Sequence, residues 1–398
     1  MSLSSLPAGF LWGTSSSAHQ TEGNNINDWS EWEKTSKGIE KSGQTCNAYK
    51  NYQLHISLMK KFNNNAYRFS IEWSRIFPRK GHVDEDAINH YKNLLISLKK
   101  DNIRVFVTLH HFTNPIWFSD LGAFTKPKNI KYFLDFVNVC IDNLGNYIDY
   151  WVIINEPTTY ILKSYLMGIW PPGRKSLFDA INVYKNLAAT HNSAYKLIKS
   201  KIPNSNIGSA HQIIVYYSMN KSFLNMILAK IQNYLVNDYF YKKTSGSHDY
   251  FGINYYFRNP VSLKFLFKKI DKNAREKILE DKGECYGWSM DPSGIYNAIM
   301  YANKKDKSKE IYILEHGLSD PTDTVRADYL RIAIEQINKA VINKANVRGY
   351  LHWTLIDNFE WDLGYISKFG LCRLDSNGEI FPKPSAFKYS DLIKKYSN

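Results

Sequence analysis

Short apolar runs alternate with longer amphipathic stretches along the whole chain. Eight of these runs are rich in β-branched and aromatic residues and predict strands. They are Phe10–Gly13, Ala66–Phe69, Val105–Leu109, Tyr150–Ile154, Ile207–Ala210, Tyr250–Asn254, Ile311–Leu314 and Arg348–Trp353. The segments between them have helical periodicity, as in His90–Lys100 and Ile130–Leu144, where apolar side chains recur on one face.

Apolar strands that alternate with amphipathic helices indicate a parallel sheet with helices on its outer face. Eight repeats close most economically into a barrel, so we predict an α/β fold, a single (β/α)8 TIM barrel over residues 1–398. An open nucleotide-binding sheet is the alternative. The segment after the first strand, GTSSSAHQTEG, lacks the glycine spacing of a phosphate loop and disfavours it. No Ser/Gly/Pro linker divides the chain, which favours one domain.

The composition supports a large folded core, since 44% of the residues are hydrophobic and 15% are aromatic. The first residues lack the charged and apolar regions of a signal peptide, and no apolar run reaches the roughly 18 residues of a membrane helix. Four cysteines occur without a C-x-x-C pair, which predicts reduced, structural thiols: Cys46, Cys140, Cys285 and Cys372. We therefore expect a cytoplasmic protein without membrane insertion.

The net charge of +14 raises the question of an anionic partner. The lysines are spread in pairs, such as Lys60-Lys61 and Lys304-Lys305, and do not form one basic arm. This distribution is typical of solvated helix surfaces and does not predict nucleic-acid binding. The net charge does not decide whether the substrate is anionic.

Two glutamates stand at the ends of predicted strands. Glu156 follows the apolar run WVIIN, and Glu315 ends the run IYILE. A buried carboxyl group is costly unless it is paired or used, so each glutamate alone fits a structural ion pair equally well. In a (β/α) barrel, however, the strand ends form the active site, and glycosidic bond cleavage needs two carboxyl groups. Arg68, at the end of the second strand, is predicted to hold Glu315 ionised; a structural ion pair is the alternative.

Seven motifs follow one another in the chain: FLWGTSSSAHQTEG, YRFSIEWSRIFP, TLHHFTNP, INEP, DYFGINYY, ILEHG and GYLHWTLIDNFEWDLGY. With them the chain resembles the family 1 glycoside hydrolases, the β-glucosidase and β-galactosidase family, from Phe10 to Tyr389. The resemblance implies a cofactor-free, retaining β-glycosidase with Glu156 as general acid/base and Glu315 as nucleophile. In such an enzyme the two carboxyl groups lie about 5–5.5 Å apart.

The resemblance also implies a set of sugar-binding residues, because a sugar needs polar partners for its hydroxyls and an aromatic platform for its face. These are Gln20, His111, Asn155, Tyr256, Trp353, Glu360 and Trp361, with Arg68 and Asn254 as supporting residues.

For several of these residue types, a purely structural role is the alternative. Aromatic residues are abundant, so we interpret four tryptophans as structural: Trp12, Trp32, Trp73 and Trp151. His110 and His111 are neighbours, but adjacent strand residues point to opposite faces, so we predict no metal site.

The chain departs from the family pattern beside the nucleophile, where the usual T-E-N-G reads Leu314-Glu315-His316-Gly317. His316 is expected to influence the pKa of Glu315 or the loop. Thr158 replaces a residue that is often aromatic, and a loop from Arg258 to Glu284 is short, so the leaving-group side is expected to be open.

The retained Phe359-Glu360-Trp361 segment disfavours phosphorylated sugars, because the Glu360 carboxylate would repel a phosphate. Glu156 itself disfavours thioglucoside hydrolysis, for which relatives carry glutamine.

Three functions follow from these residues. The first is hydrolysis of a small-molecule β-glycoside with a terminal unphosphorylated sugar, with glucose ahead of galactose or fucose. The second is transglycosylation, in which an alcohol or lipid takes the sugar from the same intermediate. The third is a sugar-binding protein with a degenerate site, motivated by Leu314 and His316. The sequence does not specify the oligomeric state.

Overall fold

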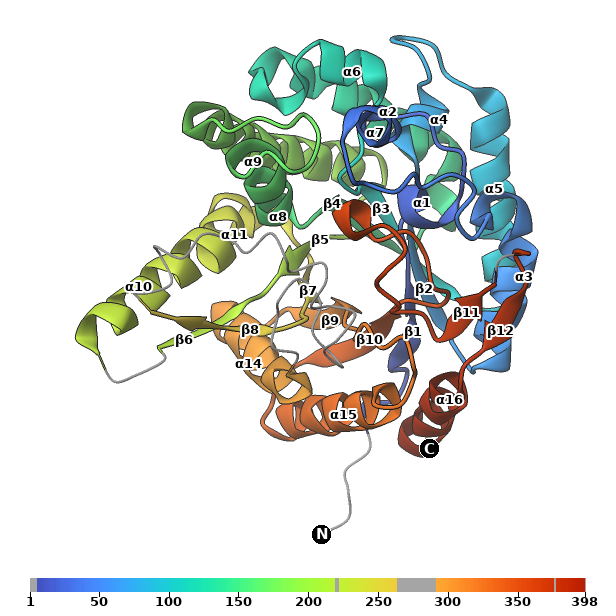
Figure 1. Cartoon of the computed structure of the whole chain (residues 1–398), viewed down its shortest axis with the longest axis vertical. Coiled ribbons are helices and arrows are strands. Elements are labelled where there is room, and N and C mark those ends of the chain that lie inside the picture. The colour runs from blue at the N-terminus through green and yellow to red at the C-terminus, as the bar shows by residue number, and fades with distance from the viewer. Residues whose placement is uncertain (1–5, 219–221, 263–290, 376, 398) are drawn as a thin grey trace.

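The computed structural model describes residues 6–218, 222–262, 291–375 and 377–397. Eight parallel strands form a closed barrel in the order β1-β10-β9-β7-β5-β4-β3-β2 (Figure 1). Their bounds are β1 Leu11–Ser15, β2 Ala66–Ser70, β3 Arg104–His110, β4 Tyr150–Asn155, β5 Asn206–Gln212, β7 Tyr250–Asn254, β9 Glu310–Glu315 and β10 Val347–Trp353. All eight predicted strands are confirmed with small shifts at their ends, and so is the (β/α)8 barrel.

Helices surround the barrel (Figure 1). The longer ones are α2 Asp28–Thr35, α3 Ala48–Lys61, α5 Glu85–Lys100, α7 Ile130–Leu144, α9 Leu177–Lys201, α10 Phe223–Asn233, α14 Ile295–Lys305, α15 Arg326–Ile342 and α16 Pro384–Ser397. Shorter ones are α1 Ala18–Thr21, α4 Trp73–Ile76, α6 Ile116–Asp120, α8 Pro157–Ile161 and α11 Tyr239–Thr244, with π-helical turns η4 Leu162–Leu166 and η5 Tyr234–Asp238.

Both named helix predictions are confirmed, and α7 has the predicted bounds. Helix α5 begins five residues before the predicted start at His90, at Glu85. Its N-terminus is set by Asp84, whose side chain accepts a hydrogen bond from the backbone N–H of Ala87 at 2.9 Å. The buried face already includes Ala87 and Ile88, so the predicted start at His90 was too late, and the capping residue Asp84 marks the true start.

The core has two layers. An inner cluster fills the barrel and includes Phe106, Tyr250, Tyr312 and Leu314, while a larger outer cluster lies between strands and helices. At Gly252 an added Cβ would lie 2.6 Å from a methyl carbon of Leu314, so the glycine leaves room for this leucine. Leu314, which departs from the family pattern, therefore has a packing role inside the barrel.

Two short sheets were not predicted. Strand β6 (Val215–Ser218) pairs in parallel with β8 (Arg258–Val261), and β11 (Cys372–Leu374) pairs antiparallel with β12 (Ile380–Pro382). The β6–β8 ribbon stands away from the barrel beside α10 (Figure 1). These strands have three or four residues each, too few for a periodic signal.

Three of the four cysteines, Cys46, Cys140 and Cys372, are buried free thiols, as predicted. Cys285 lies outside the described residues, as does most of the shortened loop that ends at Glu284. Among the helices that the structure describes, none combines the length and apolarity needed to cross a membrane.

Candidate active site

A cavity of about 870 Å³ opens at the carboxyl ends of the barrel strands. The predicted residues that line it are Gln20, His111, Asn155, Glu156, Tyr256, Glu315, Trp353, Glu360 and Trp361. The structure therefore brings together residues that are separated by up to 341 positions in the chain, from Gln20 to Trp361. The supporting residues Arg68 and Asn254 are fully buried and hydrogen-bond to members of this set.

Arg68, on β2, contacts residues of four other barrel strands. Its guanidinium forms an ion pair with Glu315 and donates to Asn155 Oδ1 at 2.7 Å. It also donates to Thr108 Oγ1 at 3.0 Å and to Ser15 Oγ at 3.2 Å. A fully buried guanidinium is tolerated because its donors are used in this way. The predicted contact between Arg68 and Glu315 is present.

Glu156 lies between β4 and α8 with φ of +39°, in the left-handed region. Its Oε1 accepts a hydrogen bond from Asn254 Nδ2 at 2.7 Å, and Asn254 also donates to Asn155 at 3.1 Å. Burial, and next the charge of Glu315, raise the pKa of Glu156 to about 8. The carboxyl group of Glu156 is therefore predominantly protonated at neutral pH.

Glu315 has different surroundings. One carboxyl oxygen pairs with Arg68, and the other accepts a hydrogen bond from the Tyr256 hydroxyl at 2.8 Å. Both contacts favour the carboxylate form.

The neighbouring His316 packs toward the helices, where its Nδ1 lies 2.9 Å from Tyr350 Oη and its ring stacks on Tyr329. Burial lowers the pKa of His316 to about 3, so this imidazole is neutral at physiological pH.

The opposite edge of the cavity holds a second polar group. Gln20 Nε2 donates to Glu360 Oε2 at 3.0 Å and to the Phe359 carbonyl at 2.8 Å. Burial, and next the charge of Glu315, raise the pKa of Glu360 to about 8. The Nε2 of His111 is 3.2 Å from Asn155 Nδ2, and its ring is nearly parallel to the rings of Trp353 and Trp361, with 6.1 Å between the ring centroids in each pair.

His110 points away from the cavity, as the strand geometry predicts. It packs against Phe124 and Tyr160 in the outer core, and its Nε2 lies 3.2 Å from Asn114 Oδ1. Within the described ranges no group of three or more histidine, cysteine or acidic side chains is arranged to hold a metal ion.

The wall away from the two glutamates is mainly apolar, and sequence reasoning missed it. It includes Trp32, Leu162, Met167, Ile169, Trp170, Ile214 and Phe257. Trp32 was interpreted as structural, but it lines the cavity, whereas Trp12, Trp73 and Trp151 are fully buried as expected. Apart from Trp32, which lies in α2, these wall residues come from loops and short elements, where no periodicity distinguishes a cavity side chain from a core side chain.

Thr158 does not line the cavity. Its hydroxyl donates to the Val236 carbonyl in η5 at 3.2 Å, which joins α8 to η5. The next residue, Thr159, lines the cavity instead, and its hydroxyl donates a hydrogen bond of 2.5 Å to Gln212 Oε1.

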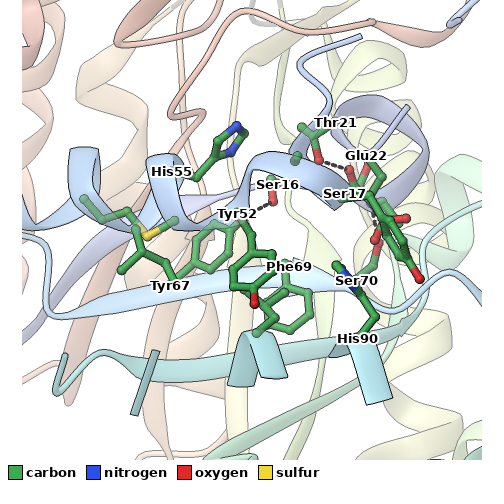
Figure 2. Close-up of a pocket in the computed structure, with 16 residues that line it drawn as sticks. Ser16, Ser17, Thr21, Glu22, Tyr52, His55, Tyr67, Phe69, Ser70 and His90 are labelled. Carbon is green, nitrogen blue, oxygen red and sulfur yellow. Dashed lines mark hydrogen bonds between the residues drawn. The ribbon is translucent and has the colours of Figure 1, made fainter. Parts of the chain in front are cut away.

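A second, much smaller cavity lies between the first strands and helices α3 and α5 (Figure 2). It is lined by Ser16, Tyr67, Phe69 and His55, among others, and has a volume of about 20 Å³. This volume has room for about one water molecule, so this cavity is not a substrate site.

Paired carboxyl groups at the strand ends of a (β/α)8 barrel are the means by which many glycoside hydrolases cleave their substrates, and this chain is an O-glycosyl hydrolase. The model of glycosyl hydrolase family 1 matches residues 2–245 and 235–397, so the chain belongs to this family.

Relatives of known sequence and structure agree with this membership. The 1,4-β-D-glucan glucohydrolase of Thermotoga neapolitana is 27% identical over 98% of both chains, and β-glucosidase 1 of Oryza sativa subsp. japonica is 30% identical over 99% of this chain and 90% of its own. The structure of the β-glycosidase from Pyrococcus horikoshii is similar with a TM-score of 0.87 and 31% identity, covering 99% of this chain and 98% of that one.

Proposed function

We propose that this protein is a retaining β-glucosidase in which Glu156 is the general acid/base and Glu315 the nucleophile. The observation that carries the proposal is the unequal environment of the two glutamates. Arg68 and Tyr256 stabilise the Glu315 carboxylate, while burial and the charge of Glu315 raise the pKa of Glu156 to about 8. One carboxyl group is thus prepared to attack and the other to donate a proton.

In the first step, Glu156 gives its proton to the glycosidic oxygen while a Glu315 oxygen attacks the anomeric carbon. The bond to the leaving group breaks, and a covalent glycosyl-enzyme forms. In the second step, Glu156, now a carboxylate, takes a proton from water as the water oxygen attacks the anomeric carbon. Glu315 leaves, the sugar departs with its original configuration, and Glu156 is protonated again.

Glucose is the proposed sugar, because relatives named as glucohydrolase and β-glucosidase align over nearly the whole chain. Gln20 and Glu360 bind the hydroxyls at the far edge, Asn155 binds the 2-hydroxyl, and Trp353 supports the ring face. A sugar phosphate at this edge would lie beside the Glu360 carboxyl group. Burial raises the pKa of Glu360 to about 8, so this group is predominantly protonated at neutral pH, and the repulsion predicted from the sequence develops only as the pH rises through about 8.

The test is to follow hydrolysis of an aryl β-glucoside by proton NMR. Retention predicts that the β-anomer of glucose appears before mutarotation produces the α-anomer. An α-anomer that appears first contradicts the proposed roles, since it requires direct attack by water. A panel of aryl β-glycosides that differ only in the sugar then identifies the preferred glycone.

Transglycosylation is a second candidate, because the apolar wall with Leu162, Met167 and Ile214 offers a surface for an alcohol acceptor. The same glycosyl-enzyme would transfer its sugar to the acceptor oxygen, with Glu156 taking the acceptor's proton. Product analysis with added octanol distinguishes the two, because an octyl glucoside forms only by transfer.

A further inference from the structure

Helix α10 presents its apolar side to the outside. Phe223 is 71% exposed, Leu224 is 57% exposed and Leu235, in the following turn η5, is 54% exposed. Met226, Ile227 and Ile231 are also exposed. These six residues are called the α10 outer face. Exposed apolar side chains are ordinary when single, but a contiguous set on one helix marks an interaction surface.

The inner side of the same helix is polar or small. Asn225, Ala229 and Asn237 are the buried positions of the α10–η5 segment. Asn237 fixes the orientation, because it accepts a hydrogen bond from the backbone N–H of Ile214 at 3.1 Å and donates to the Ile214 carbonyl at 2.8 Å. The usual arrangement of an amphipathic helix is thus inverted, and specific hydrogen bonds hold it in that arrangement.

The charged residues at this face are mainly lysines, and Asp238, at the end of η5, is paired with Lys305. No acidic residue occurs from Phe223 to Asn237. Lys230 is exposed on the same helix, and Lys242 Nζ lies 4.6 Å from the ring centroid of Tyr234 in η5. The whole chain carries a net charge of +14. Apolar side chains bordered by lysines fit the interface of an anionic lipid bilayer, where the apolar groups enter the headgroup region and the lysines meet lipid charges.

The α10–η5 segment that carries this face packs on its inner side against residues of the substrate cavity. Ile214, which Asn237 holds, lines the apolar wall, and so does Tyr216 in the β6 strand on which α10 packs. Leu162, another wall residue, is 43% exposed and follows α8, which Thr158 joins to η5. An apolar chain that leaves a bilayer bound at α10 would therefore meet apolar side chains on its way to the apolar wall of the cavity.

We propose that the α10 outer face binds the surface of an anionic lipid bilayer, and that the enzyme takes from this surface β-glycosides whose leaving group is a long apolar chain. The substrate part of this inference rests on the proposed function. Binding is peripheral, since none of the helices in the described part of the chain is suited to cross a bilayer.

A second copy of the chain is a poorer occupant. An 11-residue helix is about 16 Å long, and its single face falls well short of the roughly 800 Å² per partner of a stable interface. Two copies would also bring like charges together, whereas an anionic bilayer neutralises them.

The experiment measures sedimentation of the full-length protein with vesicles of phosphatidylcholine, with and without phosphatidylglycerol. The test variant is F223Q/L224Q/L235Q. A matched control, L54Q/I96Q/I342Q, removes three comparably exposed apolar residues from other helices. Turnover of a water-soluble aryl β-glucoside reports on folding and on the proposed function independently of lipid.

The expected result is binding of the native protein and the control to vesicles with phosphatidylglycerol, weakened by salt, and a loss of about tenfold or more in the test variant. K230E/K242E is expected to weaken binding to anionic vesicles only. Turnover of hexadecyl β-glucoside embedded in vesicles should fall in each variant in proportion to its loss of vesicle binding, while turnover of the soluble substrate stays unchanged.

Absence of vesicle binding by the native protein overturns the proposal. It is also overturned if size-exclusion chromatography with light scattering shows a dimer that the test variant dissociates, or if the test variant loses thermal stability because residues 263–290 of this chain cover the face. Failure of the proposed function has a different signature: vesicle binding persists, but the soluble glucoside is not hydrolysed.

Discussion

The two ends of the substrate cavity are built in different ways. At the inner end, Glu156, Glu315, Arg68, Asn155 and Asn254 form one network in which each side chain has at least one hydrogen-bond partner at 3.2 Å or less. At the outer end, the wall consists mainly of apolar side chains from loops and short helices. The inner end therefore holds its groups in fixed positions, whereas the outer end offers a surface without fixed directions.

This difference indicates a division of the catalytic task. Directional hydrogen bonds and charges act on the transition state, where a small displacement is costly, so changes at the inner end should lower kcat. Apolar contacts act similarly on the bound substrate and the transition state, so changes at the outer end should mainly raise KM. Four substitutions test this division, in order of decreasing effect.

Replacement of Glu315 by alanine is expected to give the largest loss. Without the nucleophile no glycosyl-enzyme forms, and kcat for an aryl β-glucoside should fall by about 10⁴-fold or more. Added azide should restore part of the rate by occupying the space of the carboxylate, and the product should be an α-glucosyl azide. Glu335→Ala on the surface of α15 serves as the control. A loss of less than tenfold in Glu315→Ala would assign the nucleophile elsewhere.

Replacement of Glu156 by alanine should give a loss that depends on the leaving group. Alkyl glucosides need protonation of the departing oxygen and should react about 10³-fold more slowly, within the range of general acid catalysis. Dinitrophenyl glucoside needs no proton, so formation of its glycosyl-enzyme should be little affected. Pre-steady-state kinetics with both substrates measures this contrast. Equal losses for the two substrates contradict the acid/base role.

Replacement of Asn254 by alanine tests the position of the proton on Glu156. The pKa of Glu156 is about 8, so kcat/KM of the native enzyme should fall as the pH rises through about 8 and the acid loses its proton. The hydrogen bond from Asn254 favours the carboxylate and lowers this pKa, so its removal raises the pKa further. The alkaline limb should therefore move upward by roughly 1 pH unit. Asn138→Ala, on the surface of α7, should leave the limb in place.

Replacement of Met167 by serine at the outer end should have the smallest effect. Loss of apolar contact worth about 1 kcal/mol should raise KM for octyl β-glucoside roughly fivefold. Turnover of a methyl glucoside, which does not reach the wall, should be unchanged. A fall in kcat as large as that expected from the inner end would abolish the distinction between the two ends.

Sequence reasoning performed differently at the two ends for the same physical reason. Glu156 and Glu315 follow regular buried strands, and the barrel rule turns a strand end into a position in space. Trp32 lies inside helix α2 and not at a strand end, and Ile214 lies two residues beyond β5, where its position is held by the contact of Asn237 with its backbone.

The inverted helix α10 was likewise not anticipated. An amphipathic pattern indicates that one side is apolar, but it does not indicate which side faces the core. For Leu314 and His316 the sequence showed a departure from the family pattern. Only the packing shows that Leu314 fills the barrel and that His316 stacks on Tyr329.

The backbone conformation at Glu156 lowers the stability of the fold, whereas the side chain at this position is needed for activity. With φ of +39°, this residue adopts a conformation that costs a side chain about 1–2 kcal/mol relative to glycine. Its carboxyl group is also held in a buried site that disfavours its charge. Glycine at this position should therefore raise the melting temperature of the protein while abolishing turnover of alkyl glucosides. Selection for thermal tolerance alone would remove this glutamate, and only selection for activity retains it.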